Sequence, residues 1–378
     1  MPLERHPLSP RLDHAPESLP REAYLSQDWF GREMASVFTK QWICVGRVAD
    51  FAPKTMRRVT VGAGSVIVCN TGTTLAAYHN VCRHRGSELC GHDSAELGKL
   101  ITCPYHAWAY AASDGRLVST AYAKPTPDFD KADHGLLPVA AKVWNGFLFL
   151  NASANPGEIG SDVPLSTLDH WPMKELVTGH RWVKELACNW KVFWENYSEC
   201  LHCPGIHPEL CDLVPIYKTG VMGPTEALGW TPDQELQRNL KPGADTWTLT
   251  GEPCGPVFPA LTENEKQAGY TFVTLWPSLY VVAHVDYVRA VRVEPIAPEC
   301  TRLTAEWYFS KETLAQPGFD AREVAGFAKI VLGQDGDASE MNQRGLRSPA
   351  FAHGRLMPEE YEIHRFHKWV LQQLEEKT

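Results

Sequence analysis

Two short motifs, each with one cysteine and one histidine, constrain this chain more than any other feature. They are Cys82-x-His84 and Cys103-x-x-His106, separated by residues 85–102. Structural zinc sites more often use paired cysteines followed by paired histidines. One cysteine and one histidine from each of two loops instead suit a two-iron cluster, in which two thiolates hold one iron and two imidazoles hold the other. The motifs therefore predict two loops that hold a [2Fe–2S] cluster between them.

Two other interpretations of these motifs stay open at this point. The four residues could form a zinc knuckle, or they could lie in turn loops that bind no metal. Cys90 and His92 are rival ligands by residue type. They do not fit the pairing of one cysteine and one histidine in each loop, so we do not include them in the predicted site.

The residues around these motifs are typical of a β domain. "RRVTVGAGSVIVCNT" at 57–71 contains two runs of alternating valines, which predict two strands. "WAYAASDGRLVST" at 108–120 predicts a hairpin with Asp114-Gly115 at its turn. "KVWNGFLFLNAS" at 142–153 predicts one further strand. The Gly- and Pro-rich stretch at 151–164 is the predicted connection to a second domain.

A second stretch, "ENYSECLHCPGIH" at 195–207, is dense in metal-ligand side chains. On a helix that begins near Asn189, the side chains of Glu195, Glu199 and His202 would share one face. Pro204-Gly205 should then end that helix and let His207 return toward His202. The chain has no His-Glu-x-x-His motif, so the sequence gives little support to a zinc protease site. Two histidines and one carboxylate instead suit a mononuclear Fe(II) site with open positions.

Beyond the predicted connection the pattern mixes strands and helices. Strands are expected within 270–285, 288–296 and 301–310, and long helices within 319–346 and 358–376. An earlier helix is expected at about 21–39. We therefore predict an α+β chain in three parts: an N-terminal segment at 1–41 that packs on the catalytic domain, an all-β domain at 42–155, and a catalytic domain at 156–378.

The motifs Cys82-Arg83-His84-Arg85-Gly86 and Cys103-Pro104-Tyr105-His106 resemble a Rieske [2Fe–2S] domain. Respiratory-chain Rieske proteins carry a further cysteine in each loop, and this chain has Ser87 and Tyr105 at the matching places. It is therefore similar to the oxygenase type. The likeness to the catalytic subunit of Rieske non-heme iron oxygenases extends from about Trp42 to the C-terminus. It implies a C-terminal helix-grip domain, in which a curved antiparallel sheet surrounds long helices.

The resemblance also implies the remaining site residues. The late helix of the family carries an aspartate followed five residues on by an acidic residue and then by glutamine, a pattern that Asp335, Glu340 and Gln343 match. Asp335 is therefore the expected third iron ligand beside His202 and His207, with Asp337 as the alternative. In the family, an acidic residue at the position of Glu199 bridges a Rieske histidine of one subunit to an iron histidine of the next.

The implied activity is that of a terminal oxygenase with a [2Fe–2S] cluster and Fe(II). It would use O2 and electrons from NAD(P)H, delivered by a flavin/iron–sulfur reductase, and it would form a head-to-tail homotrimer. The glutamate at position 199 is more typical of the branch that resembles glycine betaine and carnitine monooxygenases. We therefore favour monooxygenation or N-demethylation of a quaternary ammonium or small amine compound. Hydroxylation, O-demethylation or dihydroxylation of an aromatic compound is the alternative substrate class.

Composition excludes several other classes of function. The net charge of −9 and the lack of a basic run argue against a nucleic-acid partner. No segment reads as a signal peptide or membrane span, and the 11 scattered cysteines favour thiols and metal ligands over a disulfide framework, so we expect a cytoplasmic protein. A Rieske electron carrier and a zinc-binding module remain alternatives of another class. Candidate aromatic residues for a substrate cage are Trp194, Trp230, Trp247, Trp276, Tyr270 and Tyr280.

Overall fold

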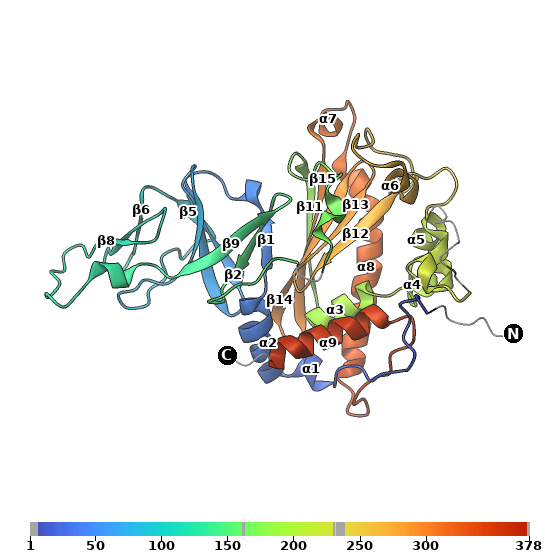
Figure 1. Ribbon diagram of the computed structural model, residues 1–378, viewed down its shortest axis with the longest axis horizontal. Coiled ribbons are helices and arrows are strands. Elements are labelled where there is room, and N and C mark those ends of the chain that lie inside the picture. Colours follow the sequence, from blue (N-terminus) through green and yellow to red (C-terminus); the bar gives the residue numbers. More distant parts are fainter. Residues whose placement is uncertain (1–6, 161–162, 230, 232–238, 376–378) are drawn as a thin grey trace. The chain divides into compact units, whose positions relative to one another are not determined.

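A computed structural model describes residues 7–160, 163–229, 231 and 239–375 of the chain (Figure 1). The chain divides into two compact units, Gly31–Ser161 and a unit made of Met1–Phe30 with Asp162–Thr378. The first division falls within helix α2 (Gln27–Lys40), and the second falls in the Gly- and Pro-rich connection. Trp230, one of the candidate cage residues, lies outside the described residues.

The first unit is built from antiparallel strands. Seven strands form a sheet in the order β1-β10-β9-β4-β3-β2-β5, and three more form a small sheet in the order β6-β7-β8. The strands are β1 (Ile43–Arg47), β2 (Thr55–Val61), β3 (Gly64–Asn70), β4 (Leu75–His79), β5 (Ser94–Glu96), β6 (Leu100–Thr102), β7 (Ala109–Ala111), β8 (Leu117–Ser119), β9 (Pro138–Trp144) and β10 (Phe147–Asn151).

The segment at 142–153, which the sequence predicts as one strand, forms a hairpin instead. Strands β9 and β10 pair from Phe147 opposite Trp144, and Asn145-Gly146 makes the turn between them. Both turn residues have positive φ, 48° and 79°. A two-residue Asn-Gly turn of this kind matches the twist of paired strands, so the dipeptide was the signal for the hairpin.

The second unit is an α+β body around a curled antiparallel sheet. Its five strands lie in the order β11-β15-β14-β13-β12. They are β11 (Val177–Leu186), β12 (Tyr270–Leu275), β13 (Leu279–His284), β14 (Val288–Ala297) and β15 (Cys300–Phe309). The helices of this unit include α1 (Glu22–Leu25), α3 (Trp190–Tyr197), α4 (Cys203–Ile206), α5 (Pro208–Leu213), α6 (Glu263–Ala268), α7 (Lys311–Leu314), α8 (Ala321–Leu346) and α9 (Tyr361–Glu375).

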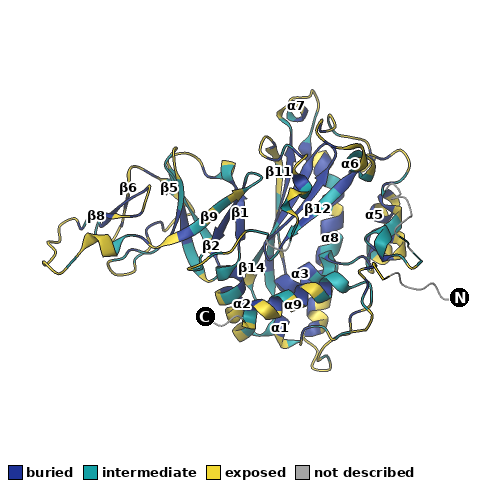
Figure 2. Cartoon of the chain, viewed as in Figure 1, coloured by how far each residue is buried: buried dark blue, intermediate teal, exposed yellow. Residues whose placement is uncertain are grey.

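The core of this unit lies between the sheet and its long helices. Strand β13 is buried throughout, β15 is buried over most of its length, and β14 is buried mainly in its first half (Figure 2). Helix α8 contacts β11 and α3, and α3 also contacts α9. The predicted α+β class, with a curved antiparallel sheet and long helices, is confirmed. No helix in the described part of the chain has the length and apolarity needed to cross a bilayer.

Asn189 ties the start of α3 to three other segments. Its side-chain oxygen accepts a hydrogen bond from the N–H of Lys191 and so caps the helix. Its Nδ2 donates to the carbonyl oxygens of Tyr24 and Pro298, at 3.3 and 2.6 Å. Its own N–H donates to Oε1 of Gln343 on α8. The residue is buried, so these bonds position the helix from within the core.

We predict that Asn189→Ala lowers the free energy of unfolding of this unit by about 2–3 kcal/mol, because it removes a helix cap, the donor to the carbonyl oxygen of Pro298 and one of two donors to that of Tyr24. Denaturant unfolding followed by tryptophan fluorescence measures the loss. Asp320→Ala is the matched control, since Asp320 caps α8 in the same way but at an exposed position, where a cap contributes about 1 kcal/mol. Equal losses in the two variants would contradict the buried role of Asn189.

Candidate metal centres

The two predicted cluster loops have the same backbone geometry. The first follows β4, and the second joins β6 to β7. In each loop the N–H of the cysteine donates to the carbonyl oxygen five residues on, from Cys82 to Ser87 and from Cys103 to Trp108. The fifth residue of each turn, Gly86 or Ala107, has positive φ and closes the loop. Two matched turns therefore present the predicted ligands from two sides.

The four predicted cluster ligands lie together, with the thiols inside and the imidazoles outside. Cys82 and Cys103 are buried, whereas His84 is exposed and His106 is half-buried. The ring centroids of His84 and His106 are 4.7 Å apart. This donor set fits a [2Fe–2S] cluster, because it places two soft thiolates on one side and two imidazoles on the other.

Hydrogen-bond donors surround the two sulfurs. The hydroxyl of Tyr110 lies 3.1 Å from Sγ of Cys82. Burial raises the pKa of Cys82. Burial also acts to raise the pKa of Cys103, but hydrogen bonds from the backbone N–H groups of Tyr105 and His106 outweigh it, and the pKa falls. The environment of Cys103 thus favours the thiolate, the form that binds iron.

The rival ligands Cys90 and His92 have another arrangement. The thiol of Cys90 donates to the carbonyl oxygen of His92 at 3.2 Å. The side-chain oxygen of Asn80 accepts hydrogen bonds from the N–H groups of Leu89 and Cys90. This segment therefore has a local hydrogen-bond network of its own. His92 is not part of either cluster loop.

The helix predicted to carry Glu195, Glu199 and His202 on one face ends earlier than expected. Helix α3 stops at Tyr197, and Ser198 is its C-cap. Glu199 therefore lies in the turn between α3 and α4, and the expectation of a continuous helix to His202 is wrong. Pro204 does not end a helix either. It lies in the first turn of α4, where its missing N–H leaves no intrahelical bond unmade.

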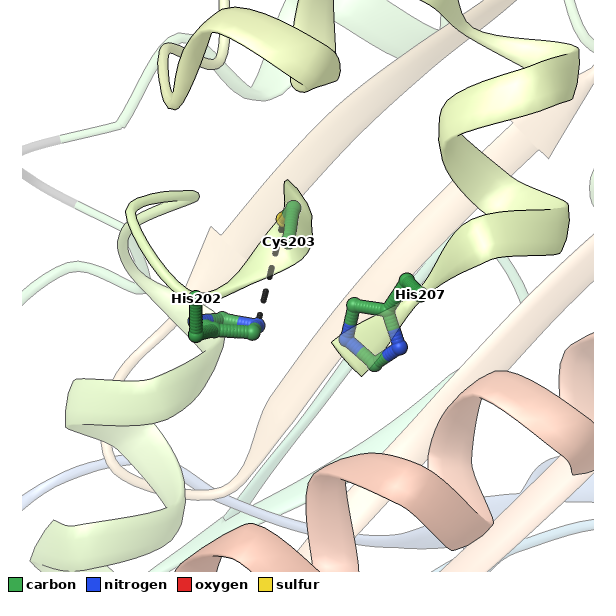
Figure 3. Close-up of side chains that lie close together, drawn as sticks. All are labelled: His202, Cys203 and His207. Atoms are coloured by element: carbon green, nitrogen blue, oxygen red, sulfur yellow. Dashed lines mark hydrogen bonds between the residues drawn. The ribbon is translucent and has the colours of Figure 1, made fainter. Parts of the chain in front are cut away.

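The turn nevertheless brings the two predicted iron histidines together. The ring centroids of His202 and His207 are 5.1 Å apart, and the two side chains lie close together (Figure 3). The Nε2 atom of His207 lies 2.9 Å from Oδ1 of Asp335, and that of His202 lies 3.5 Å from the same oxygen. Two imidazole nitrogens and one carboxylate oxygen converge, which fits a mononuclear iron site.

Two further side chains hold the histidines in the orientation that a metal needs. Nδ1 of His202 lies 2.5 Å from Oε1 of Glu199, and Nδ1 of His207 lies 2.7 Å from Oε1 of Gln334. Both partners accept hydrogen bonds, so each Nδ1 carries the proton and each Nε2 faces Asp335. Such outer hydrogen bonds set the tautomer and raise the basicity of a ligating histidine.

The electrostatics of these three residues suit a bound cation. Burial acts to lower the pKa of His202, but its hydrogen bonds to Asp335 and Glu199 outweigh burial and raise the pKa to about 9. Burial acts to raise the pKa of Asp335, but hydrogen bonds from His202 and His207 lower it to about 2. The carboxylate is therefore ionised, which is the form that binds a metal ion.

Asp337, the alternative third ligand, lies elsewhere. Its side chain is 83% exposed and lies 3.8 Å from Nζ of Lys184. Glu340 and Gln343, which match the family pattern, accept hydrogen bonds from the N–H groups of Ala187 and Asn189. The geometry therefore favours Asp335, and the other two residues fasten α8 to the segment that precedes α3.

Cys200 and Cys203 are joined as a disulfide, which the sequence did not predict. The Sγ atom of Cys203 also lies 3.9 Å from Nε2 of His202 (Figure 3). His202, Cys203 and His207 thus form a possible metal-binding group by distance alone. A disulfide sulfur is not the thiolate that binds metals, so Asp335 completes the set better. Nine cysteines remain free thiols.

A cavity opens beside the three converging residues. It holds about 510 Å³ of empty space, its opening to solvent included. Of the candidate cage residues, Trp247 and Tyr280 line it, whereas Trp194, Trp276 and Tyr270 do not. Three residues of the site were not predicted from the sequence. Asn196 and Arg289 line the cavity, and Gln334 bonds His207. The signal for Arg289 was a basic residue within the apolar strand β14.

The chain matches known proteins over both units. Residues 41–130 match the Rieske [2Fe-2S] domain, and residues 173–376 match the ring hydroxylating alpha subunit (catalytic domain). A glycine betaine monooxygenase oxygenase subunit of Chromohalobacter salexigens is 30% identical, over 89% of this chain and 81% of that protein. A carnitine monooxygenase oxygenase subunit of Acinetobacter baumannii is 29% identical, over 90% and 88%.

Solved structures share the fold. A quaternary ammonium Rieske monooxygenase, CntA, in complex with an inhibitor superposes with a TM-score of 0.72 at 23% identity, over 99% of this chain and 100% of that chain. Naphthalene 1,2-dioxygenase from Rhodococcus sp. bound to indole superposes with a TM-score of 0.63 at 16% identity, over 96% and 95%. Together with the two matched loops and the catalytic domain, these likenesses show that the chain belongs to the Rieske non-heme iron oxygenases, as the oxygenase component with a [2Fe–2S] cluster and a mononuclear iron.

Proposed function

We propose that His202, His207 and Asp335 hold the mononuclear iron of this oxygenase. Cys82, Cys103 and the two histidines of the matched loops, His84 and His106, would hold its [2Fe–2S] cluster. The observation that carries the proposal is the approach of two imidazole Nε2 atoms to one carboxylate oxygen, at 2.9 and 3.5 Å.

The chain's own residues prepare this site for oxidation of a bound substrate. When bound, the cluster supplies single electrons and the iron supplies the chemistry of O2 activation. Glu199 and Gln334 fix the protons of the two imidazoles on Nδ1. The aromatic side chains of Trp247 and Tyr280 line the cavity beside them and limit the access of water. The cavity would hold the substrate next to the metal.

Glu199 would also lie on the electron-transfer path between subunits. Its carboxylate contacts His202 and is 11% exposed, and it lines an open depression together with Glu195, Glu360 and His367. A neighbour's cluster loop could reach this depression and place its own His106 against Glu199. The cluster of each chain would then pass electrons to the iron site of the next. This arrangement requires a closed ring, most simply a head-to-tail homotrimer. The electrons would come from NAD(P)H through a flavin/iron–sulfur reductase.

The proposed reaction is monooxygenation or N-demethylation of a quaternary ammonium or small amine compound. The names of the relatives, glycine betaine and carnitine monooxygenase oxygenase subunits, support this substrate class. The aromatic wall suits a quaternary ammonium group through cation–π attraction. The same wall would suit an aromatic ring, so oxidation of an aromatic compound is the alternative.

Iron content tests the assignment of the third ligand. We predict about three irons per subunit in the wild-type protein and about two in Asp335→Ala, as expected for a [2Fe–2S] cluster with and without one mononuclear iron. The visible cluster spectrum should persist in the variant. Asp337→Ala is the matched control, because its exposed side chain lies two residues away on the same helix. If Asp337→Ala loses iron and Asp335→Ala keeps it, the assignment is wrong; zinc in place of iron would contradict both centres.

The role of Glu199 can be separated from metal binding. In Glu199→Gln the amide oxygen can still accept a hydrogen bond from His202, so both metals should stay bound, but the bridging charge is lost. We expect cluster reduction by the reductase to be unchanged and product formation to fall roughly 10–100-fold. Rapid mixing measures the two steps separately. Glu195→Gln, which lines the same depression without contacting His202, should keep most activity. Full activity in Glu199→Gln would remove this residue from the electron route.

Tyr110 should tune the potential of the cluster. Its hydroxyl donates to a ligand sulfur, which stabilises the reduced form, so Tyr110→Phe should lower the reduction potential by on the order of 60 mV, corresponding to ~1.4 kcal/mol. Spectroelectrochemistry measures the shift. Tyr78→Phe is the control, because Tyr78 lies in the same core but donates to the carbonyl oxygen of Ala112. Equal potentials in the two variants would show that the Tyr110 bond does not act on the cluster.

A further inference from the structure

Arg289 is a buried cation in the wall of the iron cavity. Its residue exposure is 4%, and its buried Nε and Nη1 atoms have no hydrogen-bond partner among the described residues. The side chain lines the cavity together with His202, His207 and Asp335. A buried guanidinium without a partner destabilises a fold, so its place in a ligand cavity requires an explanation.

The fold fixes Arg289 in the middle of the sheet. It lies on the central strand β14, opposite Val282 of β13 and Trp307 of β15. Its guanidinium carbon lies 6.0 Å from the centroid of the Trp247 ring. Neither neighbouring strand offers a carboxylate at the paired position. The charge is therefore held in place by packing and has no acidic group of the described chain to neutralise it.

Other buried donors in the same wall also lack partners. The hydroxyl of Tyr280 and Nε1 of Trp247 are buried, make no hydrogen bond and belong to residues that line the cavity. Tyr280 stacks on Tyr197 with ring centroids 3.8 Å apart. Both tyrosines line the cavity together with Arg289 and Asp335.

We propose that Arg289 binds a carboxylate of the substrate. A guanidinium presents two parallel N–H donors that match a carboxylate, and the neighbouring donors can complete its hydrogen bonding. The substrate would then be a compact acid or zwitterion, anchored by its carboxylate at Arg289. Its opposite end would lie along the Tyr197–Tyr280 stack toward His202, His207 and Asp335. This assignment rests on the proposed oxygenase function, and it adds the substrate's charge and orientation.

The strand offers a matched control three residues on. Arg292 points to the opposite face of the sheet from Arg289, because side chains alternate along a strand. It faces Glu306, with 3.7 Å between Nε and the carboxylate, and it does not line the cavity. Arg292→Gln therefore removes the same charge from the same strand without changing the proposed binding site.

The test is calorimetric binding of paired probes to the iron-loaded protein without reductase. The pairs are glycine betaine with choline, and benzoate with benzamide; within each pair only one member carries a carboxylate. At least one carboxylate should bind at least about tenfold more tightly than its counterpart without a carboxylate. Arg289→Gln should abolish this preference, Arg289→Lys should retain part of it, and Arg292→Gln should leave it intact.

The outcomes separate this proposal from the proposed function. Equal binding within both pairs, or a preference that survives in Arg289→Gln, would overturn the role of Arg289. Loss of the preference in Arg292→Gln as well would overturn it too, because a general effect of net charge would then explain the result. Binding is measured without turnover, so none of these results depends on oxidation of a probe. A protein that binds carboxylates through Arg289 but oxidises none of the probes would still satisfy this assignment.

Discussion

The catalytic unit is organised around one carboxylate oxygen. Oδ1 of Asp335 lies within 3.5 Å of the Nε2 atoms of His202 and His207 and also accepts a hydrogen bond from Nδ2 of Asn196 at 2.7 Å. These groups come from α3, the following turn, the start of α5 and the middle of α8. Helix α8 packs closely on β11 beside Asp335. A Cβ at Gly336 would lie 2.8 Å from a methyl carbon of the buried Leu186, so a larger residue there would require the leucine side chain to shift. Glycine within a helix costs about 0.5–1 kcal/mol, which indicates that the close packing matters.

The residues that converge at the two candidate centres could be predicted because metal chemistry restricts residue types and spacing. Cysteine and histidine in two loops, two histidines close together and a later aspartate are recognisable without coordinates. The path of the backbone between them was harder to predict. A helical pattern through Glu199 and His202 satisfied the periodicity, but the side chain of Ser198 bonds the carbonyl of Trp194 and the helix ends there. Local side-chain bonds of this kind compete with helix extension and are not visible in periodicity.

Residues whose role depends on tertiary contacts could not be predicted from the sequence either. Gln334 neighbours Asp335 in the chain, yet its action on His207 follows only from its hydrogen bonds to His207 and Glu209 across the fold. The same holds for Arg289, which reads as one more charge in a strand until its burial is known. In contrast, Asn145-Gly146 is a strong local hairpin signal and was overlooked because the flanking residues are continuously apolar. Strand β10, which follows the turn, is buried throughout and so lacks the alternation that marks a half-buried strand.

The absence of an acidic neighbour at Arg289, among the described residues, gives the cavity its selectivity. A glutamate at a paired strand position would neutralise the cation and stabilise the empty protein, but it would also compete with any carboxylate that enters. Val282 and Trp307 occupy those positions, and the guanidinium carbon lies 6.0 Å from the centroid of the Trp247 ring, which does not occupy its donors. The free cation then favours anionic groups, whereas the ionised Asp335, which lines the same cavity, repels them. Two opposite charges in one cavity would orient an asymmetric molecule, since binding in the reverse sense would leave the cation unpaired and bring two anions together.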